Sequence, residues 1–198
     1  MFIVLDTETT GLYASKSEIL EFAAIKVNDD GTTEEFHTLI KPQNLQTASR
    51  TALGVNGYLE NSHKWDDAPL MGEVGDKIAD FCRGAEFIVG HNIKFDLEMI
   101  EANFRRYGVR RKLPFYSVDT QMLVIQTIWP IFNRFGIKKK TKMDYIREIL
   151  GFSFKDSHTA LKDTRDTLKL FQMLFKPTLL TKMRLYFAVW NYSRNLSK

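Results

Sequence analysis

The amino-acid sequence predicts an α/β fold built as one domain. Three observations indicate this: a short apolar run at Phe2 to Leu5, two β-rich segments separated by a turn, and, after residue 70, helical spacing of apolar residues that alternates with short strands. A chain of 198 residues is of ordinary size for one well-packed domain. The sequence shows no internal repeat and no segment of low complexity.

The first part of the chain predicts a strand followed by an antiparallel hairpin. Phe2 to Leu5 is apolar and rich in β-formers, and the turn-like TTG at 9–11 follows it, so we predict a buried strand. Ile19 to Val27 and Glu35 to Ile40 are the next predicted strands. The turn signal NDDG at 28–31 between them is typical of a hairpin.

Helices and strands alternate after residue 70. Apolar residues recur at helical spacing from Val74 to Cys82 and stop at Gly84. The apolar segment Phe87 to Val89 predicts a strand, and the pattern from Phe95 to Tyr107 predicts a helix that ends at Gly108. This alternation is the pattern of an α/β protein.

The end of the chain predicts two helical segments. An apolar stripe runs from about Thr159 to Phe175, and Pro177 ends this helix. Beyond it, Leu179 to Tyr192 is aromatic and basic, and we expect a helical C-terminal extension there. The apolar residues of this extension either pack on the domain, which is the simpler use, or dock a partner: Leu185, Phe187, Val189 and Trp190.

Composition excludes several classes of protein. The 44% of apolar residues exclude a disordered chain, and the single cysteine, Cys82, excludes an intrachain disulfide. The start MFIVLDTETT lacks the basic and apolar regions of a signal peptide, and the longest purely apolar runs are far shorter than a membrane span. We therefore expect a soluble cytoplasmic protein without a membrane partner, with association with the nucleoid as an option.

Charge is distributed unevenly along the chain. Residues 1–100 hold 8 basic and 17 acidic side chains, whereas residues 101–198 hold 20 basic and 7 acidic ones. Such asymmetry favours a polyanionic partner such as nucleic acid, although the two signs can also mix on the folded surface. Two basic groups could line the path of a strand: Arg105, Arg106, Arg110, Arg111 and Lys112, and then Arg134, Lys138, Lys139, Lys140 and Lys142.

Two carboxylates follow the first predicted strand. Asp6 and Glu8 are two residues apart, so the period of a strand places both on the same face of the sheet. This arrangement could form half of a metal site. A pair of this kind also arises about once by chance in a chain of this length, so it carries weight only through its position.

The segment HNIKFD at 91–96 lies between a predicted strand and a predicted helix. Four specified residues of the form H-N-x-x-F-D arise by chance on the order of once in a thousand such chains. Each has an ordinary structural use as well: Asn92 as an N-cap, Phe95 in the core and Asp96 in the first helical turn. Those uses do not account for the whole string.

The segment HTALKD at 158–163 opens the last long helix. His158 and Asp163 are five residues apart, which is ~140° of rotation around a helix. The two side chains can therefore serve one site only if His158 lies at or before the start of the helix. Taken singly, each is more often an exposed polar residue.

These motifs together resemble a known family. DTETTGL, HNIKFD and HTALKDTRDT, in this order and at these distances, look like the three motifs of the DEDDh (DnaQ-like) 3′–5′ exonucleases, which include polymerase proofreading subunits and RNase T. The resemblance covers about residues 1–176, through EILEFAAIKV, FHTLIKP, ALGVNG and DTQML. It implies an RNase H-like fold with a mixed five-stranded sheet, an antiparallel hairpin and helices on both faces. We expect this domain at 1–176 and an extension at 177–198.

The resemblance also implies the chemistry of the site. Asp6, Glu8, Asp96 and Asp163 are the implied metal ligands and His158 the implied general base. Four carboxylates in one pocket repel one another unless cations neutralise them, and oxygen ligands suit two Mg²⁺ or Mn²⁺ ions better than zinc. Two such ions can activate water and stabilise the leaving oxygen of a phosphodiester, and a histidine can accept the proton at neutral pH.

Other motif residues are implied to contact the terminal nucleotide. Asn56 departs from the family, which usually has histidine at this position, so its contact is the least secure of the set. His91 is expected to support the loop rather than to bind metal. The substrate contacts implied by the resemblance are Thr7, Gly11, Leu12, Asn56, Asn92 and Phe95.

The sequence therefore predicts a metal-dependent 3′–5′ exonuclease that releases nucleoside 5′-monophosphates from single-stranded DNA. The implied settings are proofreading, repair or end trimming, with a DNA polymerase or another replication or repair protein as a possible partner. Three alternatives stay open: an exoribonuclease, a non-catalytic nucleic-acid or polymerase-binding module that keeps the fold, and an RNase H-like endonuclease.

Overall fold

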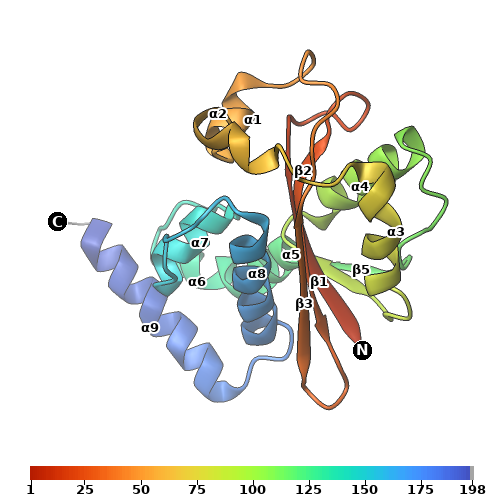
Figure 1. Ribbon diagram of the computed structural model, residues 1–198. Coiled ribbons are helices and arrows are strands. Elements are labelled where there is room, and N and C mark those ends of the chain that lie inside the picture. The colour runs from red at the N-terminus through yellow and green to blue at the C-terminus, as the bar shows by residue number, and fades with distance from the viewer. Residues whose placement is uncertain (197–198) are drawn as a thin grey trace.

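The computed structural model describes residues 1–196 and contains one mixed sheet of five strands (Figure 1). Their order across the sheet is β3-β2-β1-β4-β5. The pairs β1–β2 and β2–β3 are antiparallel, and β1–β4 and β4–β5 are parallel. This confirms the predicted α/β class and the hairpin. The strands are β1 (Phe2–Thr9), β2 (Ile19–Val27), β3 (Thr33–Leu39), β4 (Ile88–Gly90) and β5 (Ser117–Asp119).

Strand β1 is central and is longer than the apolar run predicted for it. It continues through the TET segment to Thr9 because antiparallel pairing with β2 extends to Glu8, which lies opposite Glu21. Ile3 and Leu5 face one layer of helices, and Val4 faces the other. Since side chains alternate along a strand, Asp6 and Glu8 share the face of Val4.

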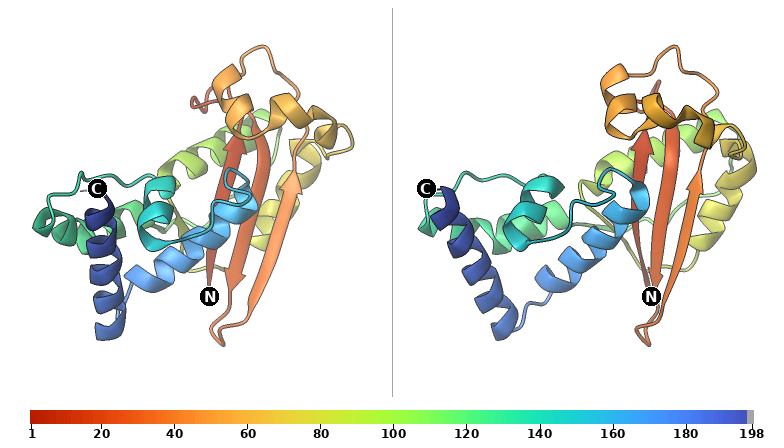
Figure 2. Two further views of the ribbon diagram at one scale, coloured as in Figure 1. Left: turned by 90° about the vertical axis from the view of Figure 1, so that its left-hand side faces the viewer. Right: turned by 60° about the vertical axis from the view of Figure 1, so that its left-hand side comes forward.

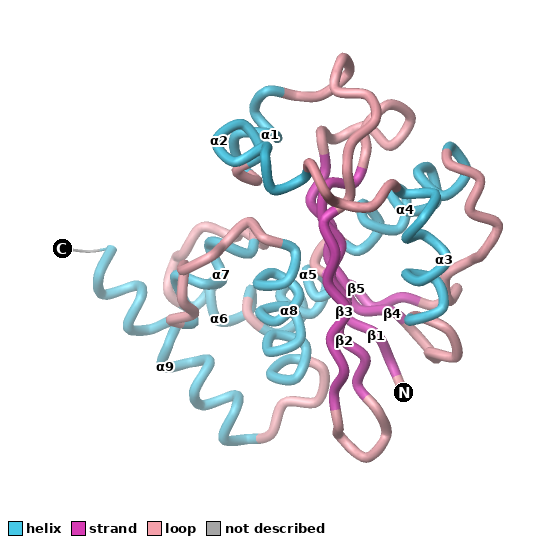
Figure 3. Tube along the Cα trace, in the orientation of Figure 1, coloured by secondary structure: helices cyan, strands magenta, loops and turns pink. Residues whose placement is uncertain are grey.

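Helices cover both faces of the sheet, as predicted (Figure 3). α3 and α4 pack on the face of Ile3 and Leu5, whereas Phe171 of α8 packs on the face of Val4. The helices are α1 (Arg50–Val55), α2 (Tyr58–Asn61), the 3₁₀ helix η1 (Ser62–Trp65), α3 (Met71–Phe81), α4 (Ile93–Arg106), α5 (Thr120–Thr127), α6 (Trp129–Arg134), α7 (Met143–Leu150), α8 (Ala160–Leu174) and α9 (Leu179–Leu196).

The long helices begin and end where the sequence signals place them. Helix α4 stops at Arg106, and Gly108 follows it with a φ of +77°, a left-handed conformation that glycine adopts without steric cost. Helix α8 has Thr159 at its N-cap, and Pro177 follows its C-terminal end. His158 therefore lies before the helix, as the spacing of its motif requires.

Helices α5, α6, α7 and α9 form a second apolar cluster beside α8 (Figure 2). Leu185 and Val189 of α9 are buried in it against residues such as Phe132 and Ile146, while Phe187 is exposed. The extension thus packs on its own domain through two of the four apolar residues considered for packing or docking. Its last two residues, 197–198, lie outside the described part. Within residues 1–196, no helix is both long and apolar enough to cross a membrane.

Candidate active site

Three of the predicted metal ligands meet at the surface between β1 and α8. One carboxylate oxygen each of Asp6, Glu8 and Asp163 lies within 4.8 Å of the other two, and all three residues are half-buried. Asp6 and Glu8 are placed there by the alternation of β1. Asp163 is placed there by the first turn of α8, which packs on the same face of the sheet.

Asp96 reaches the site from the opposite side of the sheet. It lies in the first turn of α4, is 3% exposed, and is held by Thr7 of β1. The main-chain N–H of Thr7 donates to Asp96 Oδ1 at 3.0 Å, and its hydroxyl donates to the same oxygen at 2.7 Å. Thr7 is itself buried and holds Asp96, while its predicted contact with the substrate stays a prediction.

Burial raises the pKa of each of the four carboxylates, and repulsion from the other carboxylates of the site adds to the rise at Asp6 and Glu8. Burial, together with repulsion from Asp163, Glu21 and Asp96, raises the pKa of Glu8 to about 9. Burial raises the pKa of Asp96 to about 7, although the hydrogen bonds from Thr7 oppose the rise. Burial and the other carboxylates also raise the pKa of Asp6 well above its ordinary value. The cluster therefore gains free energy from a bound cation.

A buried arginine, which sequence analysis did not single out, contacts Asp163. Arg147 of α7 is 0% exposed and donates from Nη2 to Asp163 Oδ1 at 2.5 Å, from Nη1 to Asp144 Oδ1 at 2.8 Å and from Nε to Asp166 Oδ2 at 2.7 Å. Burial raises the pKa of Asp163, and the guanidinium opposes that rise. The sequence offers only a weak signal for this role of Arg147, namely a charged residue among the apolar residues of a short helix.

His158 lies just before α8 in a left-handed conformation. Its φ is +65°, which is uncommon for a residue other than glycine, and its side chain is 40% exposed. The Nε2 atom lies 3.5 Å from Asp144 Oδ2, so the histidine and Arg147 share one carboxylate residue. The imidazole thus lies at the rim of the carboxylate site with one ring nitrogen facing an acid.

The loop that carries Asn92 is held by side chains from β5 and α5. His91 is bound at both ring nitrogens: Nδ1 lies 2.9 Å from Thr120 Oγ1 and Nε2 lies 2.6 Å from Thr141 O. The main-chain N–H of Asn92 donates to Asp119 at 3.0 Å, and Asn92 itself adopts φ +71°. Asn92 occupies the N-cap position of α4, but within residues 1–196 its side chain makes no capping bond to the helix.

The remaining predicted contacts lie around the end of β1. Leu12 is 76% exposed, and Gly11 is packed so tightly that a Cβ there would lie 2.9 Å from Ser17 Oγ. Asn56 donates from Nδ2 to Thr9 O at 3.0 Å and accepts from Tyr58 N, so its side chain braces the end of the strand. Phe95 is half-buried against the core of the α3–α4 layer. Leu12 is therefore the most open of the four.

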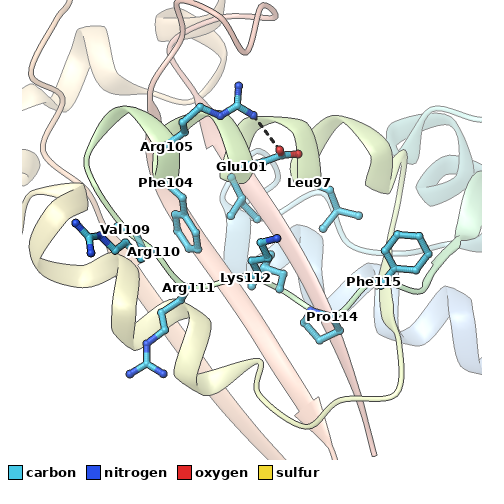
Figure 4. Close-up of a pocket in the computed structure, with 12 residues that line it drawn as sticks. Leu97, Glu101, Phe104, Arg105, Val109, Arg110, Arg111, Lys112, Pro114 and Phe115 are labelled. Carbon is cyan, nitrogen blue, oxygen red and sulfur yellow. Dashed lines mark hydrogen bonds and ion pairs between the residues drawn. The ribbon is translucent and has the colours of Figure 1, made fainter.

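The two predicted basic groups lie in different places. Four residues of the first group, Arg105, Arg110, Arg111 and Lys112, line an apolar pocket of about 450 Å³ between α4 and residues 109–115, together with Leu97, Phe104 and Phe115 (Figure 4). The fifth, Arg106, donates instead to the main-chain oxygens of Ser17 and Ala14. This pocket belongs to the α3–α4 layer, on the opposite face of the sheet from Asp6 and Glu8. In the second group, Lys140 and Lys142 flank Thr141 in the chain, and the carbonyl of Thr141 contacts His91 of the site. Arg134 of this group lies over the ring of Tyr186.

Comparison with known proteins places these features in a family. A family model described as Exonuclease matches residues 3–171. The DNA polymerase III PolC-type protein of Caldanaerobacter subterraneus subsp. tengcongensis is 29% identical over 170 residues, which cover 86% of this chain and 11% of the relative. A DNA polymerase III subunit epsilon-like protein of Rhodobacter capsulatus is 33% identical over 178 residues, 87% of this chain and 23% of that protein. The chain thus spans less than a quarter of either relative.

Solved structures share the fold. E. coli exonuclease I in complex with a dT13 oligonucleotide matches 96% of this chain and 42% of its own, with a TM-score of 0.70 and 18% identity. Exonuclease X in complex with 5′-overhanging duplex DNA matches 93% of this chain and 99% of its own, with a TM-score of 0.59 and 20% identity. The match of the family model to most of the chain shows that this protein belongs to the exonuclease family, as its three motifs predict.

Proposed function

We propose that this chain is a metal-dependent 3′–5′ exonuclease that hydrolyses the terminal phosphodiester of single-stranded DNA and releases nucleoside 5′-monophosphates. The observation that carries the proposal is the convergence of Asp6, Glu8 and Asp163 within 4.8 Å, with Asp96 held beside them by Thr7. Membership of the exonuclease family supports the reaction type.

The donor set fits hard divalent cations. Asp6, Glu8 and Asp163 offer only carboxylate oxygens, which are the ligands that Mg²⁺ and Mn²⁺ prefer. Burial raises the pKa of both Glu8 and Asp96, and neighbouring carboxylates raise that of Glu8 further, which supports a role for bound cations in keeping these carboxylates ionised. Two Mg²⁺ or Mn²⁺ ions, held by these residues and Asp96, would supply an activated water and charge stabilisation at the leaving oxygen.

His158 is suited to accept a proton from water at the rim of the site. It is partly exposed, and Asp144 lies 3.5 Å from its Nε2. An acid that faces one ring nitrogen orients the imidazole, which is the arrangement found for catalytic histidines. We assign the general-base role to His158 and the orienting role to Asp144.

The exposed lysines beside His91 are suited to guide the strand to the site. Lys139 and Lys140 lie over the rings of Trp129 and Tyr145, and Thr141 bridges this segment to His91. Cations next to aromatic rings are typical of surfaces that bind single strands. The Phe132 ring is buried and serves the core, whereas Leu12 is an exposed apolar side chain that could meet the terminal nucleotide.

The relatives support a DNA substrate and a polymerase context. The exonuclease I structure contains a dT13 oligonucleotide, and the relatives that match this chain include DNA polymerase III proteins. We therefore propose a cytoplasmic, DNA-associated role in proofreading, repair or end trimming, with a polymerase or another replication protein as partner. RNA is the alternative substrate, because discrimination depends on how the pocket meets the 2′-hydroxyl.

The proposal is tested by digesting matched 5′-labelled single-stranded DNA and RNA with Mg²⁺ or with EDTA. The expected result is a ladder that shortens from the 3′ end, runs faster on DNA, and disappears with EDTA. A circular single strand serves as the control and should stay intact. Cutting of the circle would indicate an endonuclease, and binding without cleavage of any substrate would indicate a non-catalytic module.

A further inference from the structure

Arg147 occupies an unusual position for a charged residue. Its side chain is completely buried, and its three N–H-bearing nitrogens each donate to a different carboxylate: Asp163, Asp144 and Asp166. Asp166 also accepts from Lys162 on the same helix. Burial of a guanidinium is costly unless its donors are paired, and here three directions of the planar group are filled.

This pairing fixes how Asp163 faces the site. Asp163 Oδ1 accepts from Arg147 Nη2 at 2.5 Å, and an oxygen of the same carboxylate lies within 4.8 Å of oxygens of Asp6 and Glu8. Asp163 thus lies between a rigid cation on α7 and the carboxylates of β1. Rotation of its side chain away from the acidic group would break the contact with the guanidinium and leave that cation short of a partner.

The same guanidinium reaches the histidine. Asp144 Oδ1 accepts from Arg147 Nη1 at 2.8 Å, while Asp144 Oδ2 lies 3.5 Å from His158 Nε2. Arg147 therefore contacts Asp163 directly and reaches His158 through Asp144. His158 and Asp163 lie on either side of the start of α8. We infer that Arg147 is a positioning residue that holds Asp163 toward Asp6 and Glu8 and, through Asp144, orients His158. This inference rests on the proposed metal site.

Lysine cannot replace this arrangement. Its ammonium is a compact point charge that lacks the planar fork, so it cannot align with three carboxylates in three fixed directions. Arg147→Lys keeps the positive charge and removes the planar arrangement of donors, so it tests the positioning role most directly. Substitution of a residue that hydrogen-bonds to a metal ligand and orients it typically lowers metal affinity or activity about 10–100-fold.

The experiment compares wild type, Arg147→Lys and a control, Arg165→Lys, which alters an exposed ion pair of α8 with Glu35. Mn²⁺ affinity is measured by electron paramagnetic resonance of the free ion, folding by thermal unfolding, and kcat and KM on a 5′-labelled single strand. We expect Arg147→Lys to lower Mn²⁺ affinity and kcat about 10–100-fold each with little change in KM. Arg165→Lys should match wild type in both Mn²⁺ affinity and kcat.

A folded Arg147→Lys with wild-type Mn²⁺ affinity and kcat would overturn the inference. If this variant does not fold, Asp166→Ala gives the answer, because it removes the acceptor of Nε without altering Asp163; unchanged Mn²⁺ affinity there would overturn the inference equally. A wild-type chain that binds Mn²⁺ but cleaves no nucleic acid would defeat the proposed function alone, since the loss of Mn²⁺ affinity in Arg147→Lys would still be measurable.

Discussion

Asp96 and Asp163 belong to the same proposed metal site, yet the two sides of the sheet hold them by different means. On the α4 side, Asp96 is held by two neutral donors of one residue, the N–H and the hydroxyl of Thr7. On the α8 side, Asp163 is held by the buried cation of Arg147. Neutral donors fix geometry and leave the pKa of Asp96 raised to about 7, whereas a cation also favours the ionised carboxylate.

The largest expected effects come from removing one carboxylate from each kind of environment. Asp6→Ala and Asp163→Ala should each reduce turnover to below ~1% of wild type, because each removes a proposed ligand. The two substitutions should change the free energy of unfolding of the metal-free protein in opposite directions. Loss of Asp6 relieves repulsion, whereas loss of Asp163 removes one partner of the buried Arg147.

Turnover on a labelled strand and thermal unfolding in EDTA check both halves of this prediction, with the exposed Asp30→Ala as the control. Equal destabilisation by Asp6→Ala and Asp163→Ala would show that the contact with Arg147 does not make the environment of Asp163 different from that of Asp6. Full activity in either would remove that residue from the site.

His158→Ala should slow the chemical step by roughly 10²–10⁴ and leave binding of metal and DNA nearly unchanged. The reason is that the imidazole lies at the rim, next to Asp144, and accepts a proton without contributing a ligand to the acidic group. Single-turnover kinetics and Mn²⁺ affinity measure the two effects separately. His63→Ala on η1 is the matched control, and turnover equal to wild type in His158→Ala would assign the base elsewhere.

Thr7→Val tests the neutral support of Asp96. Valine keeps the β-branched shape and the main-chain N–H but removes the hydroxyl that donates at 2.7 Å. The pKa of Asp96 should rise further, so activity at neutral pH should fall by about tenfold and recover partly as pH increases. Thr38→Val on β3 is the control, and a loss that does not recover at higher pH would indicate a different role for Thr7.

The smallest expected effect is a dependence of stability on pH. Raised pKa values mean that the folded chain binds more protons than the unfolded chain between the ordinary carboxylate range and about 7 for Asp96 or about 9 for Glu8. Metal-free stability should therefore fall as pH rises through this window. Thermal unfolding in EDTA should show a decline, and Mg²⁺ should reduce it; a metal-free chain that gains stability over the same range would contradict the burial of these acids.

The sequence predicts the parts of this molecule that have periodic or motif signals. The hairpin, the long helices and the residues of the acidic group were all accessible from alternation, helical spacing and three short motifs. Strand β5 has three residues, two of them polar, and α1, α2 and α6 are too short to show a stripe, so these elements were not predicted. Their formation depends on partners distant in the chain.

The supporting residues were not predicted for a related reason. A charged residue such as Arg147 is expected to be exposed, and its burial depends on Asp163 and Asp166, which come from another helix. The resemblance assigns Thr7 to the substrate, and only the fold shows that α4 places Asp96 beside its hydroxyl. Sequence motifs indicated which groups carry the chemistry, and the tertiary structure was needed to show what holds them.

The most direct test of the acidic group as a metal centre is anomalous diffraction from crystals of the protein soaked in Mn²⁺. We predict anomalous density between the carboxylates of Asp6, Glu8 and Asp163. This density should be absent from crystals of Asp6→Ala treated in the same way. Strong Mn²⁺ density elsewhere with none at this position would contradict the central claim.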